Sequence, residues 1–261
     1  MKVVLFCGGL GMRLRDHAEN LPKPLAMIGN RPIIWHLMSY YAHFGFKDFI
    51  LCLGYRGQAF KDYFLNYDET TSNDFVLRGR SREVELMSSD IGDWTIRLVD
   101  TGLHSNLGMR LKAVQEHLEG EEMFLANYSD GLSNLPLDTY VENFRKRDQV
   151  ASFVSVRPTT GFHFVETDKE GTVTSISSVE ESDHRINGGF FIFRSKIFDY
   201  MKDGEELVIE PFQRLVKEKM LHAHRYDGFW QCMDTFKDKQ RLDELMEHDS
   251  APWQVWKHPN E

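Results

Sequence analysis

The sequence VVLFCGG at residues 3–9 decides the fold class. Five apolar residues in an unbroken run, followed at once by two glycines, are typical of a β-strand that is buried on both faces of a sheet. Pro32 to Phe44 has the apolar spacing of a helix that stops at Gly45, and FILCLG at residues 49–54 repeats the strand-then-glycine pattern. Strand, helix and strand in this order predict a parallel βαβ unit with a right-handed crossover.

The remaining chain alternates in the same way. We expect further strands at Trp94–Val99, Met123–Asn127, Ala151–Val156 and Gly189–Phe193. We expect further helices at Leu107–Leu118, Leu137–Arg147, Glu205–Glu218 and Phe236–Glu247. Residues 66–90 alternate weakly and contain many Ser, Asp and Arg residues, which indicates short strands and loop. Since no linker or repeat interrupts the pattern, the chain is predicted to form one α/β domain.

Composition excludes several classes of protein. The 261 residues contain 31 Lys and Arg against 40 Asp and Glu, a net charge of −9, which argues against a general nucleic-acid or anionic-membrane binder. Three cysteines far apart, with no CxxC pair, indicate a reducing compartment without disulfides or a thiolate zinc site. No apolar run approaches the roughly 18 residues of a membrane span. We therefore expect a cytoplasmic protein.

A glycine-rich segment after the first strand has the opposite charge. It reads GGLGMRL at residues 8–14 and is followed by PKP at residues 22–24. Glycines let backbone N–H groups approach phosphate oxygens, and residues 1–35 carry five cations and two anions, a local charge of +3. These features indicate a polyanionic ligand, most simply a nucleoside triphosphate. The alternative is a tight turn with solvated basic residues.

Two known glycine motifs do not match this segment. The dinucleotide fingerprint GxGxxG fails because Leu14 stands where the third glycine belongs, which disfavours an NAD-dependent oxidoreductase. The phosphate-binding motif of P-loop NTPases fails because no GKS or GKT follows the loop.

Two aspartates from distant segments are candidate metal ligands. Asp130 follows the strand at Met123–Asn127, and Asp234 lies before the last helix. The carboxyl ends of strands in an open α/β sheet are where ligands bind, and two carboxylates together with phosphate oxygens suit Mg²⁺. Taken singly, Asp130 is better explained as a turn residue before Gly131, and Asp234 as a helix N-cap.

These motifs, in their order along the chain, resemble the sugar-phosphate nucleotidyltransferases. The resemblance rests on the segment from Gly8 to Lys23, Asp130-Gly131, INGGFF at residues 186–191 and MDT at residues 233–235. It is strongest to the glucose-1-phosphate cytidylyltransferases, through segments that include PIIWH at residues 32–36, VDTG at 99–102 and APW at 251–253. The resemblance implies a Rossmann-like nucleotidyltransferase fold with a mixed, mostly parallel sheet flanked by helices. It also implies Mg²⁺ as cofactor and a homo-oligomer.

The resemblance further implies a role for each matching position. It divides the domain into a nucleotide-binding half (1–150), an acceptor-binding part (151–204) and a C-terminal helical region (205–261). It assigns catalysis to Arg13 and Lys23, and metal binding to Asp130 and Asp234. The residues that it assigns to the nucleotide are Gly8, Gly9, Leu10, Gly11, Arg13, Lys23, Ser105 and Arg110. The residues that it assigns to the acceptor are Asn187 and Gly188.

The implied reaction transfers CMP from CTP to a phosphorylated acceptor, glucose 1-phosphate or a related sugar 1-phosphate, and releases pyrophosphate. A phosphate monoester, whose second pKa is about 6, is already an anionic nucleophile near neutral pH, so that no protein base is needed. The site must instead align two anions that repel each other and neutralise the developing charge. Mg²⁺ with Arg13 and Lys23 suits that task.

The acceptor region departs from the family pattern. These enzymes carry Glu-Lys-Pro shortly before Asn-Gly-Gly, and that lysine holds the acceptor phosphate, but here Val179 stands at its position. Arg185 is the candidate substitute, and Phe162 and His163 reshape the sugar pocket. Three alternatives therefore stay open: a non-glucose or non-sugar acceptor phosphate; UTP, dTTP or GTP in place of CTP; and a nucleotide-binding module without catalysis.

Overall fold

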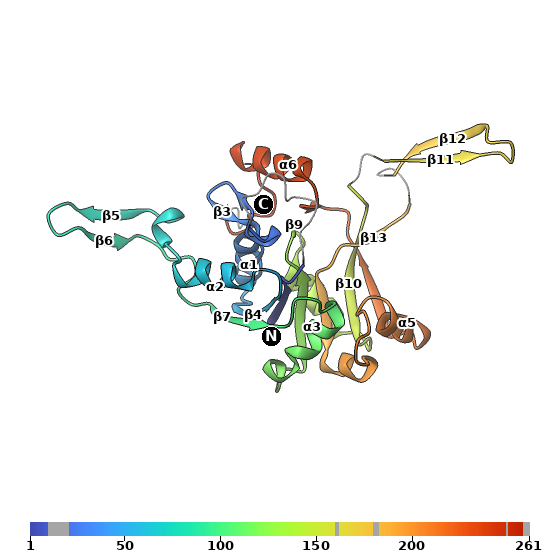
Figure 1. The fold of residues 1–261 in the computed structure, drawn as a ribbon, viewed down its shortest axis with the longest axis horizontal. Helices are drawn as coiled ribbons and strands as arrows, with labels where there is room; N and C mark the ends of the chain where they lie inside the picture. Colours follow the sequence, from blue (N-terminus) through green and yellow to red (C-terminus); the bar gives the residue numbers. More distant parts are fainter. Residues whose placement is uncertain (10–20, 160–161, 180–182, 249, 258–261) are drawn as a thin grey trace.

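The computed structural model describes residues 1–9, 21–159, 162–179, 183–248 and 250–257, and it places a mixed β-sheet between two layers of helices (Figure 1). The strands of the sheet, in spatial order, are β15 (Leu221–Arg225), β10 (Ala151–Val156), β14 (Phe191–Arg194), β8 (Met123–Tyr128), β1 (Val3–Phe6), β4 (Asp48–Leu53) and β7 (Thr95–Asp100). The short β13 (Ile186–Asn187) also pairs with β10. Only β13 and β14 run antiparallel to the others, so the predicted mixed, mostly parallel α/β sheet is confirmed.

Alternate residues of the central strand belong to two different hydrophobic cores, because side chains of a strand point to opposite faces. Val3 and Leu5 pack on one face of the sheet, and Val4 and Phe6 pack on the other. The helices on the first face are α1 (Ile33–His43), α2 (Gly57–Leu65), α4 (Leu137–Arg145) and α6 (Phe236–Glu247). The helices on the second face are α3 (Leu107–Ala113) and α5 (Glu210–Lys217). Both faces of β1 are therefore buried, as the unbroken apolar run predicted.

Six predicted strands and five predicted helices are present, with shifted ends. The predicted bounds of α6 and β10 are correct, whereas β14 begins two residues late and the helix predicted over Leu107–Leu118 is α3 followed by a 3₁₀ turn at Gln115–Leu118. The prediction missed α2 (Gly57–Leu65), in which only Phe60 is fully buried, so that its apolar stripe is narrow. The C-terminal region is not wholly helical, because β15 and β16 (Trp230–Cys232) lie within it.

Two antiparallel ribbons project from opposite ends of the molecule (Figure 1). The first consists of β5 (Phe75–Arg78) and β6 (Glu83–Leu86), which confirms strands and loop for residues 66–90. The second consists of β11 (His163–Thr167) and β12 (Val173–Ser178). Two further short pairs lie near the centre, β2 (Met27–Ile28) with β3 (Arg31–Pro32) and β9 (Gly131–Ser133) with β16. The β9–β16 pair brings the C-terminal part of the chain to the end of β8.

The structure also describes the three cysteines and the lengths of the helices. Cys7, Cys52 and Cys232 are all free thiols. None of the helices in the described part of the chain has the length and apolar character that a membrane span requires. The division into parts at residues 150 and 204 stays a prediction.

His36 on α1 is fully buried beneath the C-terminal segment. Its Nε2 lies 3.0 Å from the carbonyl oxygen of Ile28, and its Nδ1 accepts a hydrogen bond of 3.3 Å from Nε1 of Trp253. Burial disfavours the imidazolium and lowers the pKa of His36 to about 4. A neutral His36 is thus part of the contact that holds Trp253 in the core.

Protonation of His36 is expected to destabilise the fold in mild acid. The unfolded chain takes up this proton near pH 6.5 and the folded chain only near pH 4, so stability from this group is complete above pH 6.5 and falls as the pH drops to 4. The loss is about 3 kcal/mol. Urea denaturation at several pH values measures it, with His36→Gln as the matched variant. If the free energy of unfolding falls equally steeply in both proteins between pH 6.5 and 4, the prediction is contradicted.

Candidate active site

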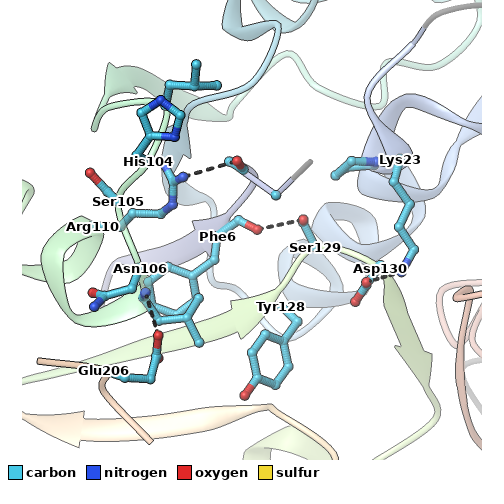
Figure 2. Close-up of a pocket in the computed structure, with 15 residues that line it drawn as sticks. Phe6, Lys23, His104, Ser105, Asn106, Arg110, Tyr128, Ser129, Asp130 and Glu206 are labelled. Carbon is cyan, nitrogen blue, oxygen red and sulfur yellow. Dashed lines mark hydrogen bonds and ion pairs between the residues drawn. The ribbon is translucent and has the colours of Figure 1, made fainter. Parts of the chain in front are cut away.

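A pocket of about 470 Å³ opens at the carboxyl ends of β1, β7 and β8 (Figure 2). The carboxyl edge of a parallel sheet is the usual ligand position of α/β folds. The residues that line the pocket are Phe6, Gly8, Gly9, Lys23, Pro24, Leu103, His104, Ser105, Asn106, Leu107, Arg110, Tyr128, Ser129, Asp130 and Glu206. Six of the residues predicted to form the site are therefore brought together: Gly8, Gly9, Lys23, Ser105, Arg110 and Asp130.

Lys23, Asp130 and Asp234 converge at one point beside this pocket. The lysine Nζ lies 2.5 Å from Oδ2 of Asp130 and 2.5 Å from Oδ1 of Asp234. The two aspartates meet because β9 and β16 pair, with Gly131 opposite Cys232, and because the N–H of Met233 donates to the carbonyl oxygen of Asp130 at 2.8 Å. Residues 104 positions apart in the sequence are thus held on one cation.

The charge of Lys23 is stabilised in this arrangement. Burial lowers the pKa of the ammonium, but the charges and hydrogen bonds of Asp130 and Asp234 outweigh burial and raise the pKa above its ordinary value. The Lys23 side chain is only 13% exposed. Its backbone is fixed as well, since it lies between Pro22 and Pro24 at the start of a 3₁₀ turn, Lys23–Leu25. The site therefore presents a fixed cation to an anionic ligand.

The two aspartates fit a divalent cation. Both carboxylates already reach one cationic centre, the Lys23 ammonium, and carboxylate oxygens are ligands that Mg²⁺ accepts alongside phosphate oxygens and water. The described residues contain no group of three or more His, Cys, Asp and Glu side chains placed to hold a metal. A metal bound here would consequently take two protein ligands and complete its shell from the substrate.

Arg110 on α3 holds three loops together from below the pocket. It is 4% exposed, and its Nη1 donates to the carbonyl oxygens of Leu53 (3.0 Å) and Gly102 (3.0 Å) and to Oγ1 of Thr101 (2.8 Å). Its Nη2 donates to the carbonyl oxygen of Gly8 at 3.1 Å. The guanidinium therefore ties the loop after β1 to those after β4 and β7, and it places a buried positive charge next to the predicted nucleotide site.

The wall of the pocket that faces Lys23 and Asp130 offers polar groups to a nucleoside (Figure 2). Ser105 donates its hydroxyl to the carbonyl oxygen of Thr101 at 2.5 Å, and Asn106 caps α3 by accepting from the N–H of Met109. Oε1 of Glu206 is buried and has no hydrogen-bond partner among the described residues. A buried acceptor without a donor is unfavourable, so this oxygen suits a hydroxyl or amino group of a bound ligand.

The predicted acceptor residues lie at a turn beside Tyr128. Asn187 accepts from the N–H of Gly189 at 2.9 Å, and its Nδ2 lies 3.3 Å from the hydroxyl of Tyr128, a pocket residue. The carbonyl oxygen of Gly188 accepts from Nε1 of Trp230 at 2.9 Å. Arg185 is directed elsewhere, since it pairs with Asp227 away from the residues that line the pocket. Leu10, Gly11 and Arg13 lie outside the described residues.

Comparison with known proteins identifies the family to which this site belongs. Residues 2–238 match the nucleotidyl transferase family. The chain belongs to that family. This nucleotidyltransferase is 36% identical, over 258 residues, to a glucose-1-phosphate cytidylyltransferase of Salmonella typhimurium, with 98% of this chain and all of that protein covered.

Other relatives of this nucleotidyltransferase are more distant. A mannose-1-phosphate guanyltransferase of Yarrowia lipolytica is 25% identical over 245 residues, which cover 91% of this chain and 62% of that protein. The crystal structure of HddC from Yersinia pseudotuberculosis, complexed with GMP-PN, superposes with a TM-score of 0.65 at 20% identity, covering 94% of this chain and 99% of that one. At that identity the likeness shows a common fold. The predicted nucleotidyltransferase fold and family are thereby confirmed.

Sequence reasoning missed several pocket residues of this nucleotidyltransferase. Tyr128 is two residues before Asp130, at the end of the same strand, so its position was a usable signal. Burial, with the nearby charges of Glu206 and Asp130, raises the pKa of Tyr128 to about 12, so the hydroxyl stays protonated and can donate. Glu206 and His104 lie in loops without any motif, and only the fold brings them to the pocket.

Proposed function

We propose that this nucleotidyltransferase transfers CMP from CTP to a sugar 1-phosphate, glucose 1-phosphate or a related compound, in the presence of Mg²⁺. The observation that carries the proposal is the convergence of Lys23, Asp130 and Asp234 beside a pocket at the carboxyl edge of the sheet. Kinship with proteins named glucose-1-phosphate cytidylyltransferase, at 36% identity over their full length, supports CTP and a sugar phosphate as substrates.

The reaction follows from the charges of the site. A phosphate oxygen of the acceptor forms a bond to the α-phosphorus of CTP, the bond from that phosphorus to the bridging oxygen breaks, and pyrophosphate leaves with the electron pair. Lys23 would hold the α-phosphate and the incoming phosphate in line, since its backbone and ammonium are both fixed. Mg²⁺ on Asp130 and Asp234 would neutralise charge on the phosphates. Arg110 would keep the Gly8 loop in a phosphate-binding shape, and Arg13 would complete the phosphate contacts.

The acceptor side supports a second candidate for the acceptor. Val179 stands where related enzymes have the lysine that holds the acceptor phosphate, and its N–H is bonded to the carbonyl oxygen of Phe162 at 3.0 Å. The described residues around the Asn187 turn include Arg185, but its guanidinium is bound to Asp227. An acceptor other than plain glucose 1-phosphate would fit this altered set of contacts.

A two-way substrate panel tests the proposed function. CTP, UTP, dTTP and GTP are each incubated with Mg²⁺ and a set of phosphorylated acceptors, and pyrophosphate release is measured. We expect turnover with CTP to exceed that with the other triphosphates, because the relatives that match this chain over their full length are named cytidylyltransferases. No pyrophosphate with CTP and any acceptor would contradict the proposal and favour a nucleotide-binding module without catalysis.

We also propose that the protein is a cytoplasmic homo-oligomer. Each projecting ribbon exposes an apolar cross-strand pair, Leu77 with Val84 in one ribbon and Val165 with Ile176 in the other. These four side chains are between 45% and 63% exposed. Isolated two-stranded ribbons are marginally stable in water, and exposed apolar patches mark interaction sites. Sedimentation velocity gives the mass that checks this proposal.

A further inference from the structure

Three arginines surround a single carboxylate beside the turn that carries Asn187. Arg185 forms an ion pair with Asp227 through Nη2, and the Nε atoms of Arg157 and Arg225 lie 3.6 and 3.7 Å from the same carboxylate. We call these four residues the arginine cluster. With three positive charges and one negative charge it carries +2, in a chain whose net charge is −9. Such a local reversal of sign attracts anions.

The position of the cluster follows from the register of the sheet. Arg225 is the last residue of β15 and lies opposite Ser155 of β10, Arg157 follows the end of β10, and Arg185 precedes β13. All three arginines are therefore at the carboxyl edge of β10 and β15. This is the same edge at which β1 and β8 present the pocket, and Figure 1 shows it between the body of the sheet and the β11–β12 ribbon.

The arginines of the cluster have different tasks. Arg185 is 13% exposed, and its Nη1 donates to the carbonyl oxygens of Ser155 (2.8 Å) and Tyr226 (3.1 Å), so it is part of the fold. Arg157 and Arg225 are 51% and 65% exposed and approach Asp227 only through Nε, beyond hydrogen-bond distance. Within the described part of the chain, the Nη atoms of Arg157 and Arg225 make no hydrogen bond. Two guanidinium ends are thus available to a ligand.

Asp227 does not neutralise the cluster. The hydrogen bond from Arg185, followed by the charges of Arg185, Arg225 and Arg157, holds the pKa of the Asp227 carboxyl below its usual range. The carboxylate therefore stays ionised near neutral pH and offsets one of three charges. Arginine forks bind carboxylate and phosphate groups through two parallel hydrogen bonds, which makes these groups the preferred ligands of the surplus charge.

The distance between the arginine cluster and Asp130 limits which ligands can reach both. Asp130 follows β8, whereas the cluster lies at the ends of β10 and β15, which are two and three strands away. Neighbouring strands are about 4.8 Å apart, so the cluster is roughly 10–14 Å from Asp130. An attacking phosphate cannot be in both places. A hexose 1-phosphate with a second charged group holds its two anionic groups several ångströms apart, and the long, exposed side chains of Arg157 and Arg225 cover the rest of this separation.

We propose that the arginine cluster binds a second anionic group, a carboxylate or a phosphate, at the end of the acceptor sugar opposite the attacking phosphate. The proposal rests on the proposed function, since it takes the acceptor to be a sugar 1-phosphate. It also accounts for the altered acceptor loop: a substrate held at its far end by Arg157 and Arg225 needs no lysine at the position of Val179.

Calorimetric titration tests the cluster without turnover. The probes are α-D-glucose 1,6-bisphosphate and α-D-glucuronic acid 1-phosphate, with α-D-glucose 1-phosphate as the reference. For the wild-type protein we expect at least one of the two probes with a second anionic group to bind about tenfold more tightly than glucose 1-phosphate. In the double variant Arg157→Gln/Arg225→Gln this advantage should disappear, while affinity for glucose 1-phosphate stays within twofold. Arg80→Gln/Arg82→Gln, at the tip of the other ribbon, is the matched control and should bind like wild type.

The outcomes separate this proposal from the proposed function. Tighter binding of the bisphosphate alone assigns a phosphate, and of the glucuronate alone a carboxylate. The proposal for the arginine cluster is overturned if the wild-type protein binds all three compounds with equal affinity. It is also overturned if the double variant loses affinity equally for all three. Pyrophosphate release with CTP is measured in parallel. If the charged probes bind through the arginines and no acceptor is turned over, the proposed function fails while the anion site stands.

Discussion

Replacement of Asp130 by asparagine is expected to lower kcat/KM about a thousandfold. The carboxylate is one of two that reach a common cation beside the pocket, and the amide removes its charge while keeping its size. Lys23 would keep Asp234 as its partner, so the site loses affinity for a divalent cation without losing its ammonium. Steady-state pyrophosphate release at increasing Mg²⁺ concentrations measures the effect. The concentration of Mg²⁺ needed for half-maximal activity should rise together with the fall in rate.

The control for Asp130→Asn separates catalysis from folding. Asp203→Asn removes a carboxylate that is 94% exposed and pairs with Lys112 at the surface, so its activity should stay within twofold of wild type. The unfolding free energy of Asp130→Asn should change by less than about 1 kcal/mol, because the side chain lies at the edge of the pocket and not in the core. Retention of more than a tenth of the wild-type rate would contradict the proposal that Asp130 binds a metal.

The sequence predicted those parts of the fold that depend on local pattern. Apolar runs that end in glycine located β1 and β4, because a strand that is buried on both faces has a continuous run of apolar residues. The strand β15, with the sequence LHAHR, was missed since it lies at the edge of the sheet and carries polar residues. The ribbon β11–β12 was also missed. Nearly all of its residues are exposed, so its sequence lacks the alternation of apolar and polar residues that marks a half-buried strand.

Site residues, too, could be predicted where a local motif marks them and not where tertiary structure alone brings them together. Asp130 and Lys23 were found because each stands in a local motif, at a strand end or between prolines. That Asp130 meets Asp234 depends on the pairing of β9 with β16, about a hundred residues apart, which no local pattern encodes. The resemblance assigns Arg110 to the nucleotide, and that role stays a prediction; the structure places Arg110 in the lining of the pocket, with its guanidinium bonded to the backbone of three loops. A contact of this kind is visible only in three dimensions.

Gly8→Ala is expected to destabilise the protein by about 3 kcal/mol, whereas Gly9→Ala should change stability by less than about 1 kcal/mol. A Cβ at Gly8 would lie 2.1 Å from Cζ of Arg110, and the guanidinium is buried and cannot move without leaving its acceptors. A Cβ at Gly9 meets no atom within 4 Å. Thermal denaturation measures the difference, which corresponds to a fall in Tm of roughly 10 °C for Gly8→Ala.

The adjacent glycines thus serve different purposes, and a double-mutant cycle shows whether Arg110 is the reason for Gly8. In an Arg110→Met background the guanidinium is absent, so Gly8→Ala should lose most of its effect, and the two substitutions should be non-additive by more than about 1 kcal/mol. Gly54→Ala should couple to Arg110 only in part, because its Cβ would lie 2.7 Å from Nη1 of Arg110 but also 2.9 Å from the backbone carbonyl oxygen of Gly8. Additive effects would mean that the glycine is required by the loop itself. In that case Arg110 would not be the residue that shapes the loop at Gly8.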